Sequence, residues 1–562
     1  MAKNSGEVVF SRLLMWTAGL ATVVVLPTSA FDPINVPKLA VISVGGFMAL
    51  GGLIAERKSL LQSKYRLVQL FAAAFLLDLI VVLLVSGTNF TQEFFGTFGR
   101  ATGFVAYVSL CLLLVAAVLA SSASTLTRVS WALLVTGGAS IIYGAFQARD
   151  MDPFNWVSSY NPVIGFLGNP NFQSSFVGFN GVVAFALMIG SSKKWLRSLM
   201  VVDFLASIVI IGATDSQQGF LVLAGGVSVV TLLWIKSSKF KVVLIPASIV
   251  SLIGAVFVAL GSLNSGPLAS LLYKASVTYR GDYWRAGWKM TVEHPLFGVG
   301  LDSYGDWYRR ARTVEATLRR GPDVVSNAAH NVLLDLSSNG GFPLLVIYLF
   351  MLGLVIIYAW KVIRRTSTFD PIFSGLFAVW IAYQAQTIIS LNQLGLAVWG
   401  WIISGLIIGY EINTRDASGE NVTKSQFKKG KSASSIAQQK VSAGVFVSMF
   451  IGGVVGFGLG SPPVIASSKL LDALSSQDPK LVQQAAYIWP RDARFMFQIT
   501  DILVNNKLMS EAQAVSDDSI LKFKDEYPIW AVRSKIEGLP QSEIDRALRE
   551  MKRLDPNNPN LK

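Results

Sequence analysis

The sequence predicts an all-α membrane protein that crosses the bilayer about twelve or thirteen times. Of its 562 residues, 52% are hydrophobic and only 15% are charged, and the mean hydropathy is +0.50. Apolar runs of close to twenty residues recur, and a bilayer core about 30 Å thick needs roughly that many residues per helix. No convincing cleavage site follows the first run, so we expect a retained span rather than a signal peptide.

Thirteen apolar runs are candidate spans, and the run at 395–410 is the least certain because it is short. The runs lie at 11–28, 38–55, 67–87, 101–120, 129–147, 172–190, 198–213, 218–235, 242–261, 342–360, 371–390, 395–410 and 441–460. Cys111 is the single cysteine and lies inside one of these runs, so no intramolecular disulfide can form.

Lysine and arginine are concentrated in alternate loops between these runs. The basic loops are 55–66, 191–198, 236–241, 361–365 and 424–440. Basic loops face the cytoplasm, so the N-terminus is predicted to be cytoplasmic, with loop 262–341 and everything after residue 460 outside. The net charge of +14 is then largely a topological signal, with a contribution from contact with anionic membrane lipids. We expect no nucleic-acid partner, because no recognisable binding module carries the charge.

Four segments follow from these patterns. They are a membrane domain at 1–410 that includes the extracytoplasmic loop 262–341, a basic cytoplasmic linker at 411–440, an additional transmembrane helix at 441–460, and an extracytoplasmic helical tail at 461–562. Within the tail, "RALREMKRLDPNNP" resembles the end of a tetratricopeptide-type hairpin, although no strict 34-residue period is visible. Two roles stay open for the tail: binding a protein partner, or capping the membrane domain.

Loop 262–341 is the longest connection between spans and is dense in arginine. Its arginines are Arg280, Arg285, Arg309, Arg310, Arg312, Arg319 and Arg320. Arginine is disfavoured beside spans on the outer face, and its planar fork suits bidentate binding of phosphate or diphosphate. The interleaved tyrosines and tryptophans suit either an interfacial belt or stacking against sugar rings.

His330, one of only two histidines, lies where this polar loop meets an apolar run. Ser326 and Asn327 are good N-caps, so a helix is predicted to begin there with His330 in its first turns. A helix N-terminus disfavours imidazolium, so the ring is expected to be neutral, as a general base requires. The alternative is a buried histidine that only hydrogen-bonds a neighbour. Two histidines and one distant cysteine offer no zinc set, and no phosphate loop of the Walker type is present, so no metal or cofactor is expected.

Two stretches resemble the O-antigen ligase and polymerase superfamily of bacterial membrane glycosyltransferases. They are "YRGDYWRAGWKMTVEHPLFGVGLDSY" (279–304) and "HNVLLDLSSNGGFPLL" (330–345), with weaker matches in "FFGTFGRATG" (94–103) and "GNPNFQSS" (168–175). The resemblance covers roughly residues 10–410. It implies a GT-C-type helical bundle that transfers a glycan, without metal, from a polyprenyl diphosphate carrier to an acceptor hydroxyl.

The resemblance also implies roles for single residues. His330 corresponds to the family's loop base, while Arg280 and Arg285 correspond to diphosphate ligands and are expected to outweigh Arg319. Asn331 and Tyr304, inside the matching stretches, are further candidate substrate contacts. His294 is expected to orient the "HPLFGVG" turn rather than to react.

The sequence departs from the family at an outside turn where many members carry arginine. Here the turn reads "TDSQQG" (214–219), and Gln217 and Gln218 can donate hydrogen bonds to phosphate but bring no charge. If the reaction did need a divalent metal, Asp215, Asp302 and Asp335 would be its candidate ligands.

Several functions stay open within and beyond the resemblance. The motifs do not separate a ligase from a polymerase of lipid-linked repeat units, and the acceptor could be a lipid, a glycan or a protein. A transporter or flippase of lipid-linked glycan would need charges or broken helices within the spans. The spans are nearly free of charge, with Asp78 and Asp203 the clearest exceptions, which favours an interfacial enzyme. The implied location is the bacterial cytoplasmic (inner) membrane.

Overall fold

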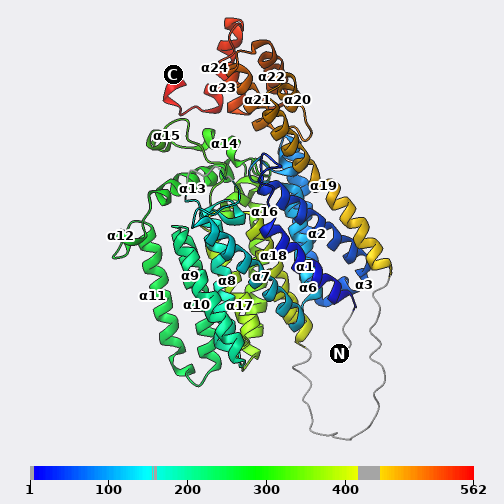
Figure 1. Ribbon diagram of the computed structural model, residues 1–562, viewed down its shortest axis with the longest axis vertical. Helices are drawn as coiled ribbons and strands as arrows, with labels where there is room; N and C mark the ends of the chain where they lie inside the picture. Colours follow the sequence, from blue (N-terminus) through cyan, green and yellow to red (C-terminus); the bar gives the residue numbers. More distant parts are fainter. Residues whose placement is uncertain (1–4, 155, 157–160, 416–442, 562) are drawn as a thin grey trace.

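The chain folds into a bundle of long helices that carries shorter helices on one of its faces (Figure 1). The computed structural model describes residues 5–154, 156, 161–415 and 443–561. The long helices are α1 (Ser5–Val23), α2 (Asn35–Ala55), α4 (Arg66–Val85), α6 (Phe104–Ala120), α7 (Ala123–Gln147), α8 (Pro170–Gly190), α9 (Lys194–Ala213), α10 (Gln217–Ser237), α11 (Leu244–Ser262), α16 (Val332–Arg365), α17 (Pro371–Thr387), α18 (Leu394–Thr414) and α19 (Ala443–Ser476). Within the described part of the chain there is no strand, so the predicted all-α fold is confirmed.

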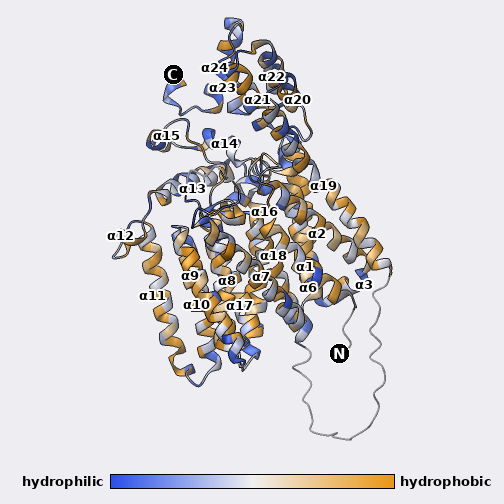
Figure 2. Cartoon of the chain, viewed as in Figure 1, coloured by the Kyte–Doolittle hydropathy of each residue, from blue (hydrophilic) through white to orange (hydrophobic). Residues whose placement is uncertain are grey.

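A helix occupies each of the thirteen predicted ranges. Ten helices of the described residues are long and apolar enough to cross a membrane, and α6 is a shorter apolar helix. Figure 2 shows hydrophobic residues along these helices and hydrophilic residues over the surface helices and the tail. The uncertain run at 395–410 is a full helix, α18, which is almost wholly buried at the centre of the bundle.

The shorter helices lie mostly on the face where α10 begins and α11 ends. Those of the loop are α12 (Ala269–Leu272), α13 (Ala275–Glu293), α14 (Tyr304–Ala311) and α15 (Val314–Arg320). Those of the tail are α20 (Pro479–Ala485), α21 (Ala493–Asn505), α22 (Met509–Lys522), α23 (Tyr527–Arg533) and α24 (Gln541–Leu554). Two more lie between spans: α3 (Arg57–Leu60) and α5 (Phe90–Phe95). The predicted basic stretch 424–440 lies outside the described residues.

Helix α19 carries the tail onto the same face as the loop. It packs along α2 through glycines spaced four residues apart: a Cβ at Gly452 or Gly456 would lie only 2.1 or 2.4 Å from the carbonyl oxygens of Phe47 and Ser43. Small residues at this spacing let two membrane helices approach closely. The helix then continues beyond the apolar run to Ser476, and Figure 1 shows the tail above the loop helices, on the opposite face from the start of α1.

A kink in α16 receives the "HPLFGVG" turn. Gly341 has φ 71°, and Pro343 has no N–H, so the carbonyl of Asn339 loses its helical donor. Gly300 N donates to Asn339 O (3.1 Å), and Val299 N donates to Ser338 O (2.8 Å). The turn after α13 is therefore fixed to the kink of α16, at residues 338–342.

Candidate active site

His330 precedes α16 rather than lying inside it, so the predicted helix start at Ser326 or Asn327 is wrong. Asn331 is the N-cap, and its Oδ1 accepts hydrogen bonds from Leu333 N (3.0 Å) and Leu334 N (3.2 Å). His330 has φ 52°, in the left-handed region that a non-glycine residue rarely adopts. Such a conformation costs about 1–3 kcal/mol and persists only where the surroundings enforce it.

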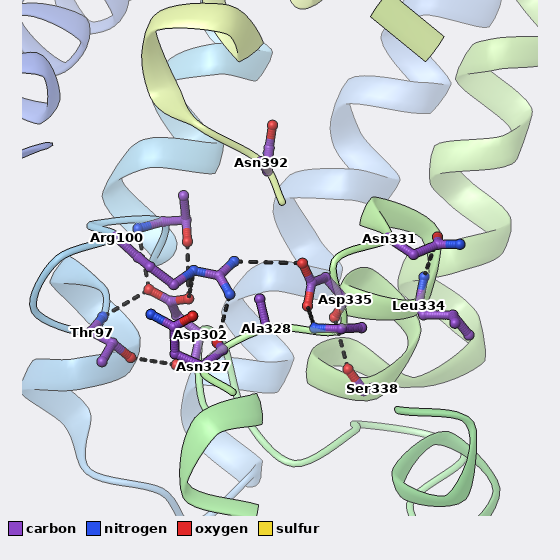
Figure 3. A network of polar contacts seen from close by, with 12 residues as sticks. Thr97, Arg100, Asp302, Asn327, Ala328, Asn331, Leu334, Asp335, Ser338 and Asn392 are labelled. Atoms are coloured by element: carbon purple, nitrogen blue, oxygen red, sulfur yellow. Dashed lines mark hydrogen bonds and ion pairs between the residues drawn. The ribbon is translucent and has the colours of Figure 1, made fainter. Parts of the chain in front are cut away.

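The surroundings that enforce it centre on Arg100, a buried arginine in the loop after α5. Arg100 Nη1 donates to Asn327 O (2.6 Å), while Arg100 Nε lies 3.1 Å from Asp302 Oδ1 and Nη2 lies 3.6 Å from Asp335 Oδ2. Asp335 Oδ1 accepts from Ala329 N (2.7 Å). Figure 3 shows Arg100 between the two carboxylates. Arg100 binds Asn327 at one end of the segment before α16, and Asp335 binds Ala329.

Asp302 extends the network to the "FFGTFGRATG" loop. Its carboxylate accepts from Thr97 N (2.7 Å) and from Thr102 Oγ1 (2.9 Å). Arg100 is a residue that the sequence analysis did not single out, although its loop carried a weak family match. Asp302 and Asp335, considered above as candidate metal ligands, are both ion-paired with Arg100.

Two arginines whose charges act on His330 have no carboxylate partner among the described residues. Within the described residues, Arg280 on α13 forms no hydrogen bond or ion pair, and burial lowers its pKa. Arg320 on α15 lies over the ring of Tyr279 (4.4 Å to the centroid) and hydrogen-bonds the hydroxyl of Tyr283. Both residues are half-buried, and the charges of both lower the pKa of His330.

The imidazole of His330 is half-buried and stays neutral. Its ring lies 5.4 Å from the ring of Tyr283, and it forms no hydrogen bond with any described residue. Burial lowers the pKa of His330 to about 3, with further contributions from the charges of Arg280, Arg100 and Arg320. The alternative of a histidine that only hydrogen-bonds a neighbour is therefore not what the structure shows.

Arg285, the second predicted diphosphate ligand, is engaged within the loop. Arg285 Nη2 lies 2.8 Å from Asp282 Oδ1, and Arg319 Nη1 lies 2.6 Å from Asp282 Oδ2. The carboxylate is buried, whereas both guanidinium groups are partly exposed. Arg285 thus differs from Arg280 in having a partner and resembles Arg319, contrary to the ranking expected from the sequence.

Tyr304 lies in the loop core rather than on a surface. It is 0% exposed, and its hydroxyl donates to Tyr283 O (2.7 Å). In this conformation it offers a substrate no surface, so it supports α13 instead. His294 is the C-cap of α13, and its ring lies 4.7 Å from that of Trp307; its role in orienting the turn stays a prediction.

The "TDSQQG" turn lies at the start of α10. Gln217 Nε2 donates to Leu271 O (2.8 Å), which connects the turn to α12. Gln218 is buried, and its Nε2 has no hydrogen-bond partner among the described residues. Neither glutamine hydrogen-bonds His330 within the described part of the chain, but Gln218 retains a free donor.

The tail is bound to the loop by a second set of arginines. Asp555 Oδ2 accepts from Arg309 Nη1 (2.9 Å) and Arg312 Nη2 (2.6 Å), and all three side chains are largely buried. Arg310 Nη2 donates to Asp525 O (2.8 Å). The tail helices pair as α21 with α22 and α23 with α24; their assignment as tetratricopeptide repeats stays a prediction.

Comparison with known families identifies one segment. Residues 203–349 match the family described as O-Antigen ligase. The segment includes the "TDSQQG" turn, the loop helices and the first part of α16, and therefore Arg280 and His330, but not Arg100. A comparison with curated proteins finds no match.

Proposed function

We propose, on the premise that the chain belongs to the O-antigen ligase superfamily, that it transfers a glycan from a polyprenyl diphosphate carrier to an acceptor hydroxyl. The observation that carries this proposal is a neutral imidazole at His330 close to the guanidinium of Arg280, neither of which has a hydrogen-bond partner among the residues that the structure describes. A base and an anion site at the edge of the bilayer suit a donor whose lipid tail stays in the membrane.

The reaction then follows from the charges. The acceptor hydroxyl gives its proton to His330, its oxygen attacks the anomeric carbon, and the bond from that carbon to the diphosphate oxygen breaks. The leaving diphosphate takes the electron pair, and Arg280 and Arg320 stabilise its charge. Gln217 and Gln218, on the turn at the start of α10, stay proposed contacts of the phosphates, and Asn331 lies beside the base.

Donor binding also strengthens the base. A histidine with a pKa near 3 accepts protons poorly, and part of that low value comes from the neighbouring arginines. A diphosphate bound to those arginines offsets their charge and raises the pKa of His330 towards its ordinary value near 6.5. The base is therefore most effective when the donor is in place.

The test uses purified protein, a polyprenyl diphosphate glycan and an acceptor, with chelator present. Transfer by the wild-type chain and its loss in His330→Ala is the expected result. Full activity of His330→Ala would remove His330 from the mechanism, and a requirement for divalent metal would direct attention to Asp215, Asp302 and Asp335. Product length separates the two family activities: a ligase moves a finished glycan, and a polymerase extends a lipid-linked chain.

The proposed location is the bacterial cytoplasmic membrane, with the N-terminus inside and the loop and tail outside. The basic loops that end α8, α10 and α16 support this orientation, because they lie on the face opposite to α13 and the tail (Figure 1). A reporter fused to the C-terminus should be active only outside the cytoplasm. A reporter active only inside would overturn the orientation.

A further inference from the structure

A lateral cavity opens between four helices of the bundle on the membrane face opposite to the loop. It has a volume of about 510 Å³, within the roughly 300–1,000 Å³ typical of ligand pockets. Its apolar walls come from α10, α11, α16 and α17 and include Leu232, Leu233, Leu244, Ile356, Ile357 and Phe377. Ile356 and Ile357 are 54% and 51% exposed, so the cavity faces the hydrocarbon of the bilayer.

Helix α11 leaves this cavity open. It lies at the edge of the bundle and packs against α10 (Figure 1), and in Figure 2 it is hydrophobic along most of its length. An apolar helix that contacts few neighbours is surrounded by lipid, and the space between it and α16 suits an acyl chain.

The mouth of the cavity carries cations and a tryptophan. Lys236, Trp360 and Lys361 line it, and Arg364 lies one turn further along α16 with its guanidinium 5.7 Å from the Trp360 ring. Lys236 Nζ donates to the carbonyls of Ile363 and Thr366, which anchors it at the end of α16.

No acidic partner of these cations lies in the described part of the chain. Within the described residues, Lys361 and Arg364 form no ion pair, and both are exposed. The nearby Asp370 is occupied as the N-cap of α17, where its Oδ1 accepts from Ile372 N and Phe373 N. The apolar cavity suits the acyl chain of an anionic phospholipid, and the cations at its mouth suit the phosphate of the headgroup.

We propose that this cavity is a binding site for one anionic phospholipid, its acyl chain between α11 and α16 and its headgroup phosphate at Lys361 and Arg364. The site is remote from His330 and Arg280, which lie at the other face of the membrane. The proposal is therefore independent of the transfer chemistry.

The test is native mass spectrometry of the full chain in detergent, titrated with phosphatidylglycerol or phosphatidylcholine. The wild-type chain should retain one phosphatidylglycerol at lower concentrations than it retains phosphatidylcholine. The double substitution Lys361→Gln with Arg364→Gln should weaken this retention roughly tenfold. Ile357→Trp, which keeps every charge but fills the cavity, should weaken it as well.

The matched control is Lys193→Gln with Lys194→Gln. These two lysines are exposed between α8 and α9 on the same membrane face but away from the cavity. Equal loss of phosphatidylglycerol in the control pair would show a diffuse electrostatic effect and overturn the proposal. Equal retention of the two lipids, or unchanged retention in Ile357→Trp, would overturn it too.

Discussion

Two sets of arginines in one loop have opposite surroundings. Arg309 and Arg312 share the buried carboxylate of Asp555 from the tail, whereas Arg280 has no partner among the described residues and lies close to His330. In the sequence both sets read as the same arginine-rich stretch. A guanidinium that already binds a carboxylate is structural, and only one without a partner is available to a substrate. The partners of each arginine, and not the composition of the stretch, therefore separate arginines that stabilise the fold from arginines that can bind a substrate.

The largest effect on transfer is expected at His330, beside the arginine that has no partner among the described residues. His330→Ala should reduce transfer by about 10²–10⁴-fold, the range typical of a general base, while the protein still inserts and binds donor. Measuring turnover and donor binding separately on purified protein checks this. His294→Ala is the control: it should leave transfer detectable, because His294 contacts Trp307 at the end of α13. Similar losses in both variants would point to a structural role for the loop as a whole.

Arg280→Ala should have the second largest effect on transfer. Losing a charge-assisted hydrogen bond to phosphate costs about 1.5–3 kcal/mol, so kcat/KM should fall roughly tenfold or more. Arg280→Lys should restore only part of this, because lysine cannot bind in a bidentate manner. Lys289→Ala, on the exposed side of the same helix, should leave kcat/KM unchanged. If Lys289→Ala matched Arg280→Ala, diffuse charge would replace a specific contact.

The pH dependence offers a third test. Because burial and then the arginines lower the pKa of His330 to about 3 in the free protein, the base form exists at all pH values above that. The acid limb of kcat/KM, which reports free enzyme, should therefore lie at lower pH than the limb of kcat, which reports the donor complex. Coincident limbs would mean that the donor does not change the charge around the imidazole. A kcat/KM limb near pH 6.5 would mean that burial and the arginines do not lower the pKa of His330 in the free protein.

Asp555→Asn tests the arginines that bind the tail. It removes the charge that Arg309 and Arg312 share, and breaking a buried pair costs about 3–5 kcal/mol. We expect limited proteolysis to release the tail while transfer falls less than in Arg280→Ala, because Arg100 holds the His330 segment independently of the tail. Glu537→Gln, in the exposed pair with Lys507, is the control and should leave the proteolysis pattern unchanged. A loss of transfer as large as that of His330→Ala would make the tail part of the active site.

The spans could be predicted from the sequence, and the site only in part, for a physical reason. Hydrophobic length alone decides where a helix crosses a membrane, so helices lie at all thirteen predicted ranges. The start of α16 depended instead on two contacts that local sequence does not reveal: Arg100, far away in the chain, binds Asn327 O, and Asp335 binds Ala329 N, which keeps residues 327–330 out of the helix. Arg100 could not be found because its carboxylates lie some two hundred residues away. Its weak motif match was the only signal.

The smallest effects are expected at Arg285 and Arg319, where the structure and the sequence disagree. Both guanidinium groups bind the Asp282 carboxylate, at 2.8 and 2.6 Å, and both are partly exposed, so either can replace the other. Each single alanine substitution should therefore cost only about 0–1 kcal/mol, and the two should be alike. The double substitution should cost more than the sum of the two, because it leaves the buried carboxylate of Asp282, on α13 itself, without a partner. A double-mutant cycle on kcat/KM measures this. If kcat/KM fell as far in Arg285→Ala as in Arg280→Ala, Arg285 would have to leave Asp282 and bind the diphosphate. The ranking implied by the family resemblance, with Arg285 above Arg319, would then stand.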